Sequence, residues 1–284
     1  MTTLYKVSGS GNDFLALPET GSPLGVLGSP PPETIRAWCR RGVSLGADGV
    51  FVLRHPRQHP EDGTVLMEYF NSDGYAADLC LNGTRCAAQL AFHLGWADNS
   101  VNVVTGAGPV AARRLDESRV TLELPAPSAP EGLPVSVDGI LYAGFRLQVG
   151  VPHFVLPWPE SLSQAPVETL GRKLREHAVF GEPGTNVNFV RFPGRSRMEI
   201  RTYERGVEAE TLSCGSGVVA SVAVGVALGA LDLPVTVAVQ GGFDLEVGAE
   251  TPGSRWLLTG DARVVAQVVL LPGAGVTPAA PAWS

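Results

Sequence analysis

The sequence lacks several features that mark common classes of protein. Its longest apolar run, residues 218–231, is shorter than the ~18 residues that suggest a membrane span, and it predicts a buried helix instead. Basic residues are not in excess, since 21 Lys and Arg against 28 Asp and Glu give a net charge of −7. Nucleic acid and anionic membranes are therefore not expected as partners. The first residues show no apolar core of a secretory signal, so we expect a cytoplasmic protein.

Cysteine is scarce, with only Cys39, Cys80, Cys86 and Cys214 in 284 residues. None of them forms the C-x-x-C pair typical of zinc sites, so no bound metal is expected, and a reducing cytosol disfavours structural disulfides. A lone buried cysteine usually packs as a small apolar residue. We interpret Cys39 and Cys86 in this way, since Cys86 falls inside an apolar helical pattern.

The sequence patterns predict a sheet-rich globular protein with few helices. An apolar content of 44% and a charged content of 17% are typical of folded chains. Each half of the chain supplies several strands and one very apolar helix, which the strands must surround because it has no polar face. Alternation of apolar and polar residues predicts strands at 49–54, 65–71, 101–106, 119–125, 186–192, 198–204 and 256–270, and helical patterns cover 33–42, 84–94, 166–178 and 217–228.

A repeat relates the two halves. The segments 79-LCLNGTRCAAQLAFHLG-95 and 213-SCGSGVVASVAVGVALG-229 both read Cys-x-(Asn/Ser)-Gly, continue through small and apolar residues, and end at Leu-Gly, 15 residues after the cysteine. Upstream, 67-MEYFNSDG-74 matches 198-MEIRTYERG-206. We infer two pseudo-equivalent α+β domains. The first covers 1–116 with a returning C-terminal strand in 265–284, the second covers 117–264, and the hinge is expected within 107–120.

Each domain should present one thiol, Cys80 or Cys214, at the N-terminus of its apolar helix. A helix N-terminus stabilises a thiolate and binds anions such as a carboxylate through its unpaired N–H groups. If the two ends face each other across a cleft, a small acid fits between them. One thiolate can then remove an α-proton while the opposite thiol delivers a proton to the other face, without a metal or pyridoxal phosphate. The N–H groups expected to hold the carboxylate are those near Leu81, Asn82, Gly215 and Ser216.

Other interpretations of the two thiols stay open. They could form a disulfide under oxidation, as an inactive state, or act as metal ligands in a structural protein. Cys80 or Cys214 could serve as a nucleophile with His153 as its base, although this leaves the second thiol unexplained. A ligand-binding module without catalysis could also retain the same cleft.

The motifs together resemble those of the diaminopimelate epimerase family. This resemblance implies two pseudo-symmetric domains, each a mostly antiparallel β-roll around a central apolar helix, and often a homodimer. It also implies an isomerase of lysine and peptidoglycan biosynthesis that works without pyridoxal phosphate on a small amino-acid substrate. The matching segments follow the family's order along most of the chain: 9-GSGNDF-14, 46-GADG-49, 70-FNSDGYAADLCLNGTRCAA-88, 150-GVPH-153, 184-GTNVNFV-190 and 203-YERGVEAETLSCGSG-217.

By position, the resemblance makes Cys80 and Cys214 the proton-transferring pair, with His153 and Glu204 supporting the catalytic step. Arg205 can bind a distal carboxylate with two hydrogen bonds, and Glu204 can pair with a distal ammonium group. From residue type alone, the asparagines would more often be turn residues, and Glu204 with Arg205 an exposed ion pair. The residues that match the family's substrate-binding set are Asn12, Asn71, Leu81, Asn82, Asn186, Glu204, Arg205, Gly215 and Ser216.

Three positions depart from the family pattern and bear on the substrate. Val151 replaces the asparagine of the common Asn-Pro-His, which removes one polar group from the pocket. Leu81 replaces a glycine after the first catalytic cysteine, and Gly49 stands where some members have glutamine. We predict conversion of LL-diaminopimelate to the meso form. The alternative is a two-cysteine racemase of a different amino acid, because unpaired polar groups on a substrate are costly to bury.

Overall fold

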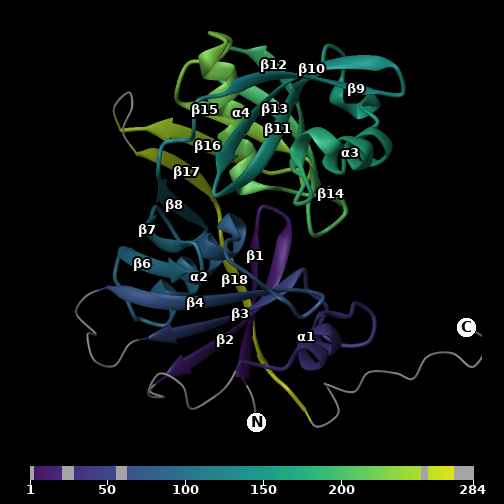
Figure 1. Ribbon diagram of the computed structural model, residues 1–284. Helices are drawn as coiled ribbons and strands as arrows, with labels where there is room; N and C mark the ends of the chain where they lie inside the picture. The colour runs from purple at the N-terminus through teal and green to yellow at the C-terminus, as the bar shows by residue number, and fades with distance from the viewer. Residues whose placement is uncertain (1–2, 21–28, 56–62, 251–254, 272–284) are drawn as a thin grey trace, which may run out of the picture. The chain divides into compact units, whose positions relative to one another are not determined.

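The computed structural model describes residues 3–20, 29–55, 63–250 and 255–271 (Figure 1). The chain divides into two compact units, with unit 1 formed by residues 1–120 and 262–284 and unit 2 by residues 121–261. Of the segment 265–284 expected to return to the first domain, residues 272–284 lie outside the described residues. The described part holds a strand, β18, which pairs with the first strand of the chain in unit 1.

Unit 1 holds two helices and most of the N-terminal strands. Helix α1 spans Pro32–Cys39 and helix α2 spans Leu81–His93. The strands are β1 (Thr3–Gly9), β2 (Asn12–Thr20), β3 (Gly49–His55), β4 (Thr64–Asn71), β5 (Ala76–Ala77), β6 (Ser100–Thr105), β7 (Gly108–Arg114) and β18 (Arg263–Val269), and the boundary between the units falls inside β8 (Arg119–Leu124).

Unit 2 also consists of two α-helices and a series of strands, as the structure describes it. Helix α3 spans Val167–Arg175 and helix α4 spans Gly215–Ala227. The strands are β9 (Glu131–Val137), β10 (Ile140–Val149), β11 (Val151–Pro157), β12 (Asn186–Gly194), β13 (Arg197–Glu204), β14 (Ala209–Thr211), β15 (Val235–Val239), β16 (Asp244–Ala249) and β17 (Trp256–Asp261).

Strand pairing follows the same order in both units. In unit 1, β1–β2 is antiparallel, β2–β3 parallel, β3–β4 and β4–β5 antiparallel, β4–β6 parallel and β6–β7 antiparallel. In unit 2, the same sequence of directions runs through β10–β11, β11–β12, β12–β13, β13–β14, β13–β15 and β15–β16. Each parallel step is bridged by a helix-containing connection, as parallel pairing requires. The predicted α+β fold with two pseudo-symmetric β-rolls is confirmed.

The central helices α2 and α4 are enclosed by strands of their own units (Figure 1). Residues 81–92 of α2 and 215–225 of α4 are buried. Helix α2 contacts β1, β4, β6, β7 and β18, and α4 contacts β10, β11, β12, β13 and β16. A helix with apolar residues on every side buries them all only in such an enclosure, which explains why these two sequences form core helices.

Several local predictions differ from the structure. The helix predicted at 33–42 ends at Cys39, because Arg40 is extended and Gly42 has a positive φ of 77°. The predicted strand at 256–270 is two strands, β17 and β18, separated at Ala262, whose N–H bonds to the carbonyl of Ser118. The segment 107–120, in which the hinge is expected, contains β7, and the boundary between the units falls at its end, after Val120. The strands that were not predicted are β1, β2, β5, β7, β9, β10, β11, β14, β15 and β16.

Across the residues that the structure describes, none of the helices has both the length and the apolar character needed to span a membrane.

Candidate active site

Cys80 is the N-cap residue of α2. Its backbone is extended, and its sulfur accepts a hydrogen bond from the N–H of Gly83 at 3.4 Å. The carbonyl of Cys80 accepts from both the N–H and the hydroxyl of Thr84. A sulfur therefore occupies the place where Ser, Thr or Asp usually caps a helix, which leaves it at the positive end of the helix dipole. The side chain is partly exposed.

Asn12 and Asn82 are joined by a direct hydrogen bond, although they lie far apart in sequence. A tight turn at Ser10 and Gly11, both with positive φ, starts β2 at Asn12 and directs its amide toward the first turn of α2. The side-chain NH2 of Asn82 donates to the side-chain oxygen of Asn12 at 2.7 Å. The guanidinium of Arg85 donates to the side-chain oxygen of Asn82 at 2.8 Å. Two predicted substrate-binding residues are thus brought together near Cys80.

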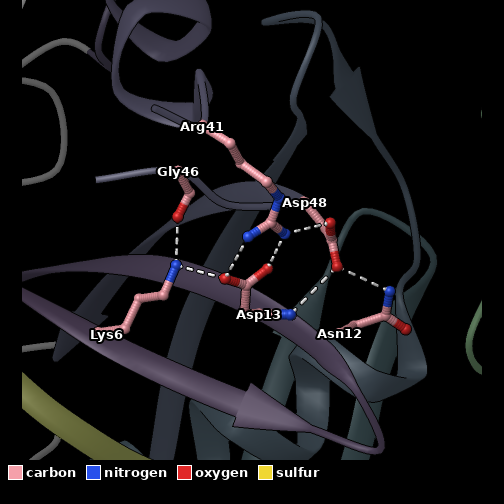
Figure 2. Close-up of polar contacts among 6 residues, drawn as sticks. All are labelled: Lys6, Asn12, Asp13, Arg41, Gly46 and Asp48. Carbon is pink, nitrogen blue, oxygen red and sulfur yellow. Dashed lines mark hydrogen bonds and ion pairs between the residues drawn. The ribbon is translucent and has the colours of Figure 1, made fainter. Parts of the chain in front are cut away.

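Asp48 holds Asn12 from the other side, a role that the sequence did not predict. Its carboxylate accepts from the Asn12 amide at 3.0 Å and from the N–H of Asp13 at 3.2 Å (Figure 2). Arg41 pairs with both carboxylates, and Lys6 pairs with Asp13. Burial raises the pKa of Asp13, but the hydrogen bonds from Arg41 and Lys6 outweigh it, so the pKa is lowered overall. The only sequence signal for Asp48 was its place within GADG.

We expect replacement of Asp48 by alanine to weaken substrate binding. The Asn12 amide would lose its acceptor, and an unpaired amide costs about 1–3 kcal/mol to keep in place. The expected result is a rise in KM of about tenfold with a smaller change in kcat, measured on the reaction that the family resemblance implies. Asp244→Ala, which removes an exposed carboxylate 3.6 Å from Arg197, is the control. An unchanged KM in Asp48→Ala would show that Asn12 does not depend on this carboxylate.

Asn71 ends β4 and lies opposite Gly49 on β3. Its backbone closes a turn, with its N–H bonded to the carbonyl of Tyr75 and its own carbonyl accepting from Gly74. A Cβ at Gly49 would lie 2.6 Å from the carbonyl of Phe70 and 2.8 Å from the hydroxyl of Tyr69. A glutamine at this position would therefore need these groups to move.

Cys214 is the N-cap residue of α4, in the position that matches Cys80 in α2. Its backbone is also extended, and its side chain is buried, with 7% exposure. The sulfur lies 3.5 Å from the hydroxyl of Ser216 and makes no side-chain capping hydrogen bond to α4. Gly215 and Ser216 open the helix, so their N–H groups belong to the first turn, which has no intrahelical acceptors. The N-terminal end of α4 therefore carries a thiol, a hydroxyl and main-chain N–H groups that have no acceptor within the helix.

Asn186, Glu204 and Arg205 lie together at the ends of β12 and β13. The side-chain carbonyl of Asn186 accepts from the backbone N–H of Arg205 at 2.8 Å. Glu204 accepts from the hydroxyl of Thr211 at 3.0 Å, and the guanidinium of Arg205 donates to the carbonyl of Pro183 at 3.5 Å. These three predicted residues form one polar group within unit 2.

His153 is almost fully buried on β11, with 1% exposure. Its pKa is lowered to about 3, chiefly by burial and further by the charge of Arg205. Its Nδ1 atom lies 3.1 Å from the side-chain nitrogen of Asn188, which is also fully buried. Asn188 was missed from the sequence, since an asparagine in a strand pattern gives no signal until its neighbour on the next strand is known.

The thiols differ in accessibility, which predicts their order of alkylation. Burial raises the pKa of Cys39 to about 12, and Cys86 is fully buried, whereas Cys80 is partly exposed. Because alkylation needs an accessible thiolate, we expect iodoacetamide to modify Cys80 well before Cys39 and Cys86. Peptide mass spectrometry after short exposure measures the order, and Cys80→Ser should remove the first label. Equal labelling of Cys39 and Cys80 would contradict the prediction.

Comparison with a solved structure establishes the class of fold. A probable proline racemase from Agrobacterium radiobacter K84 superposes with a TM-score of 0.69 at 17% identity, covering 100% of this chain and 98% of its own. The fold is thus shared with that structure over nearly its whole length. The sequence model described as diaminopimelate epimerase matches residues 4–126 and 145–265.

Curated relatives named diaminopimelate epimerase are similar over nearly the whole chain. The one from Aquifex aeolicus is 37% identical over 262 residues, covering 90% of this chain and 93% of its own length. The one from Gemmatimonas aurantiaca is 35% identical over 276 residues, covering 93% and 97%. The chain belongs to the diaminopimelate epimerase family, and it is an isomerase.

Proposed function

We propose that this protein converts LL-diaminopimelate to meso-diaminopimelate by proton transfer at the α-carbon, with Cys80 and Cys214 as the two acid–base groups. The observation that carries the proposal is the duplicated helix N-cap. Each unit places one thiol at the start of its buried central helix, in a chain of this family. One thiol, as thiolate, removes the α-proton, and the other donates a proton to the opposite face. The roles exchange when the reaction runs in reverse.

The main-chain N–H groups at the two helix starts are the proposed site of the reacting carboxylate. Charge develops on this carboxylate as the α-proton leaves, and preorganised N–H donors stabilise such charge strongly. The donors belong to Leu81 and Asn82 in unit 1 and to Gly215 and Ser216 in unit 2. Leu81 keeps the N–H that its position requires, so its side chain changes the shape of the site and not its donors. Acid–base chemistry by thiols in this setting needs no pyridoxal phosphate.

The remaining polar residues are proposed to recognise the distal end of the substrate. Arg205 can bind the distal carboxylate, and Glu204 can bind the distal ammonium group, which together match the charges of diaminopimelate. The amides of Asn12, Asn71 and Asn186 complete the set. Asn12 and Asn186 are each held by hydrogen bonds to neighbouring groups, which supports a fixed recognition surface in each unit.

Val151 favours a second candidate, a two-cysteine racemase of a different amino acid. The valine removes an amide from the proposed distal site, so a substrate with fewer distal polar groups would leave fewer of them unpaired. A non-catalytic amino-acid-binding module is the third candidate. The cytoplasmic location, the homodimer and the role in lysine or peptidoglycan synthesis remain part of this proposal, and sedimentation of the purified chain tests the dimer.

Deuterium incorporation tests the three candidates together. The protein is incubated in D2O under reducing conditions, which prevent a Cys80–Cys214 disulfide, with LL-diaminopimelate and with a panel of other amino acids. Entry of deuterium at Cα of diaminopimelate, together with formation of the meso isomer, is the expected result. Exchange with another amino acid alone would establish the second candidate. Ligand binding with no exchange for any substrate would overturn the proposed reaction.

A further inference from the structure

Three buried polar side chains form a hydrogen-bonded chain across neighbouring strands of unit 2. His153, Asn188 and Thr202 lie on β11, β12 and β13, and Asn188 is paired with Thr202 in the β12–β13 register. The Asn188 nitrogen lies 3.1 Å from Nδ1 of His153, and the hydroxyl of Thr202 donates to the Asn188 oxygen at 3.0 Å. Their exposures are 1%, 0% and 3%, so water does not compete for these bonds.

The orientation of the Asn188 amide follows from a third contact. Its nitrogen also donates to the main-chain carbonyl of Phe154 at 3.4 Å. A carbonyl can only accept, so the group that faces Phe154 must be the NH2 and not the oxygen. The same NH2 faces His153, and the oxygen faces the Thr202 hydroxyl. The amide therefore offers His153 a donor.

A donor at Nδ1 determines which tautomer His153 adopts. The Nδ1 atom must accept, so it carries no proton, and in a neutral ring the proton is then on Nε2. The low pKa of about 3, caused by burial and by Arg205, keeps the ring neutral at physiological pH. Among the described residues, Nε2 has no hydrogen-bond partner. His153 thus presents an N–H donor that the protein itself does not use.

The corresponding positions of unit 1 show that the fold does not require this polarity. Phe14 pairs with Gly49 between β2 and β3, as His153 pairs with Asn186 between β11 and β12. Two residues further along, Phe51 pairs with Tyr69 on β4, as Asn188 pairs with Thr202 on β13. The positions of His153, Asn188 and Thr202 therefore correspond to those of Phe14, Phe51 and Tyr69. The ring of Phe14 packs against those of Phe51 and Tyr69, with centroids 6.4 and 6.0 Å apart. One unit fills these positions with aromatic rings, and the other with a fully buried polar chain.

The polar chain lies against the first turn of α4, next to Cys214. A Cβ added at Gly217 would overlap the oxygen of Asn188 and would lie 3.4 Å from the Cβ of Cys214. The glycine at this position lets the Asn188 amide approach the helix end that carries the thiol. Strand β11, which holds His153, also contacts α4.

We propose that Asn188 is a positioning residue that holds His153 as a neutral Nε2–H donor, and that His153 therefore donates a hydrogen bond in the reaction and does not accept a proton. The acceptor is negative charge at the start of α4, on the Cys214 thiolate or on the reacting carboxylate. The donor role of His153 in the reaction rests on the proposed function, whereas the assignment of its tautomer does not. The inference also argues against a Cys–His nucleophilic enzyme, because the one lone pair of the neutral ring is already bonded to Asn188.

Nitrogen NMR of 15N-histidine-labelled protein tests the tautomer directly. The chain has five histidines, and a His153→Gln variant assigns the signal. The expected spectrum shows a protonated Nε2 and an unprotonated Nδ1, unchanged between about pH 5 and pH 8. A protonated Nδ1, or an imidazolium at neutral pH, in the wild-type protein would overturn the inference whatever the variants show.

Asn188→Asp tests the link to catalysis. A carboxylate can only accept, so it should move the ring proton to Nδ1 and lower kcat by about 100-fold, as loss of one preorganised donor does. Asn102→Asp, the same change at an exposed position of β6, should alter neither the ring tautomer of His153 nor kcat. A moved proton with wild-type kcat would overturn the donor role. If the wild-type protein shows no deuterium exchange at all, the proposed function fails while the tautomer result still stands.

Discussion

Cys80→Ser and Cys214→Ser should each lower the rate of diaminopimelate epimerisation by about 100- to 10,000-fold, the range that a positioned acid–base group contributes. Serine keeps the shape and places an oxygen where the sulfur stood, but its hydroxyl is a much weaker acid than a thiol. The two variants should also differ from each other in solvent exchange. Each variant should still exchange deuterium most readily with the isomer whose α-proton faces the remaining thiol, as followed by NMR or mass spectrometry.

Cys86→Ala is the matched control for these variants. Cys86 lies within α2, the helix whose N-cap is Cys80. It is fully buried and has no proposed part in the reaction. Loss of a small buried sulfur should lower the free energy of unfolding modestly while kcat stays close to wild type. If either serine variant at Cys80 or Cys214 kept the wild-type rate, the two-thiol mechanism would be wrong.

Arg205→Met should raise KM for LL-diaminopimelate by about 10- to 100-fold, because a hydrogen-bonded charged pair contributes about 1.5–3 kcal/mol. The substitution isolates the guanidinium, since Asn186 is bonded to the backbone N–H of residue 205, which any residue except proline retains. Steady-state kinetics with LL-diaminopimelate measures the change. Free lysine has no distal carboxylate, so it should bind equally weakly to the wild-type protein and to the variant.

Arg191→Met provides the comparison for Arg205. Arg191 is exposed and pairs with Glu199 at 3.4 Å, so its loss should change neither KM nor stability measurably. An Arg205→Met enzyme with wild-type KM would show that the distal carboxylate is bound elsewhere. The diaminopimelate assignment would then depend on Glu204 and the asparagines alone.

Much of the fold could be predicted because its signals are local. The helices at 84–94 and 217–228 were predicted from apolar residues on every face, and they overlap α2 and α4, which start three and two residues earlier and end one residue earlier. The start of each helix was harder to place, because the N-cap is a cysteine, which is not a usual capping residue. Strand β10 was missed because it begins with two exposed apolar residues, Ile140 and Leu141, which break the apolar alternation.

Some polar residues of the candidate site could likewise be predicted from the sequence, and others could not. Cys80 and Cys214 could be proposed from the internal repeat, and Asn186 and Arg205 from the family resemblance. Asp48 and Asn188 could not, since each acquires its role only from a partner on another strand or helix. Asp48 is 36 residues from Asn12, and Asn188 is 35 residues from His153.

By itself, the sequence determined that two similar α+β halves each carry one cysteine at the start of an apolar helix, because helix periodicity and internal repetition are properties of neighbouring residues. The tertiary structure alone decided which polar groups hold the site residues in place. Hydrogen bonds between strands depend on register, and register brings side chains that are 35 residues apart, those of His153 and Asn188, to a distance of 3.1 Å. That is why the aromatic cluster of Phe14, Phe51 and Tyr69 and the polar chain of His153, Asn188 and Thr202 occupy matching positions that no sequence repeat reveals.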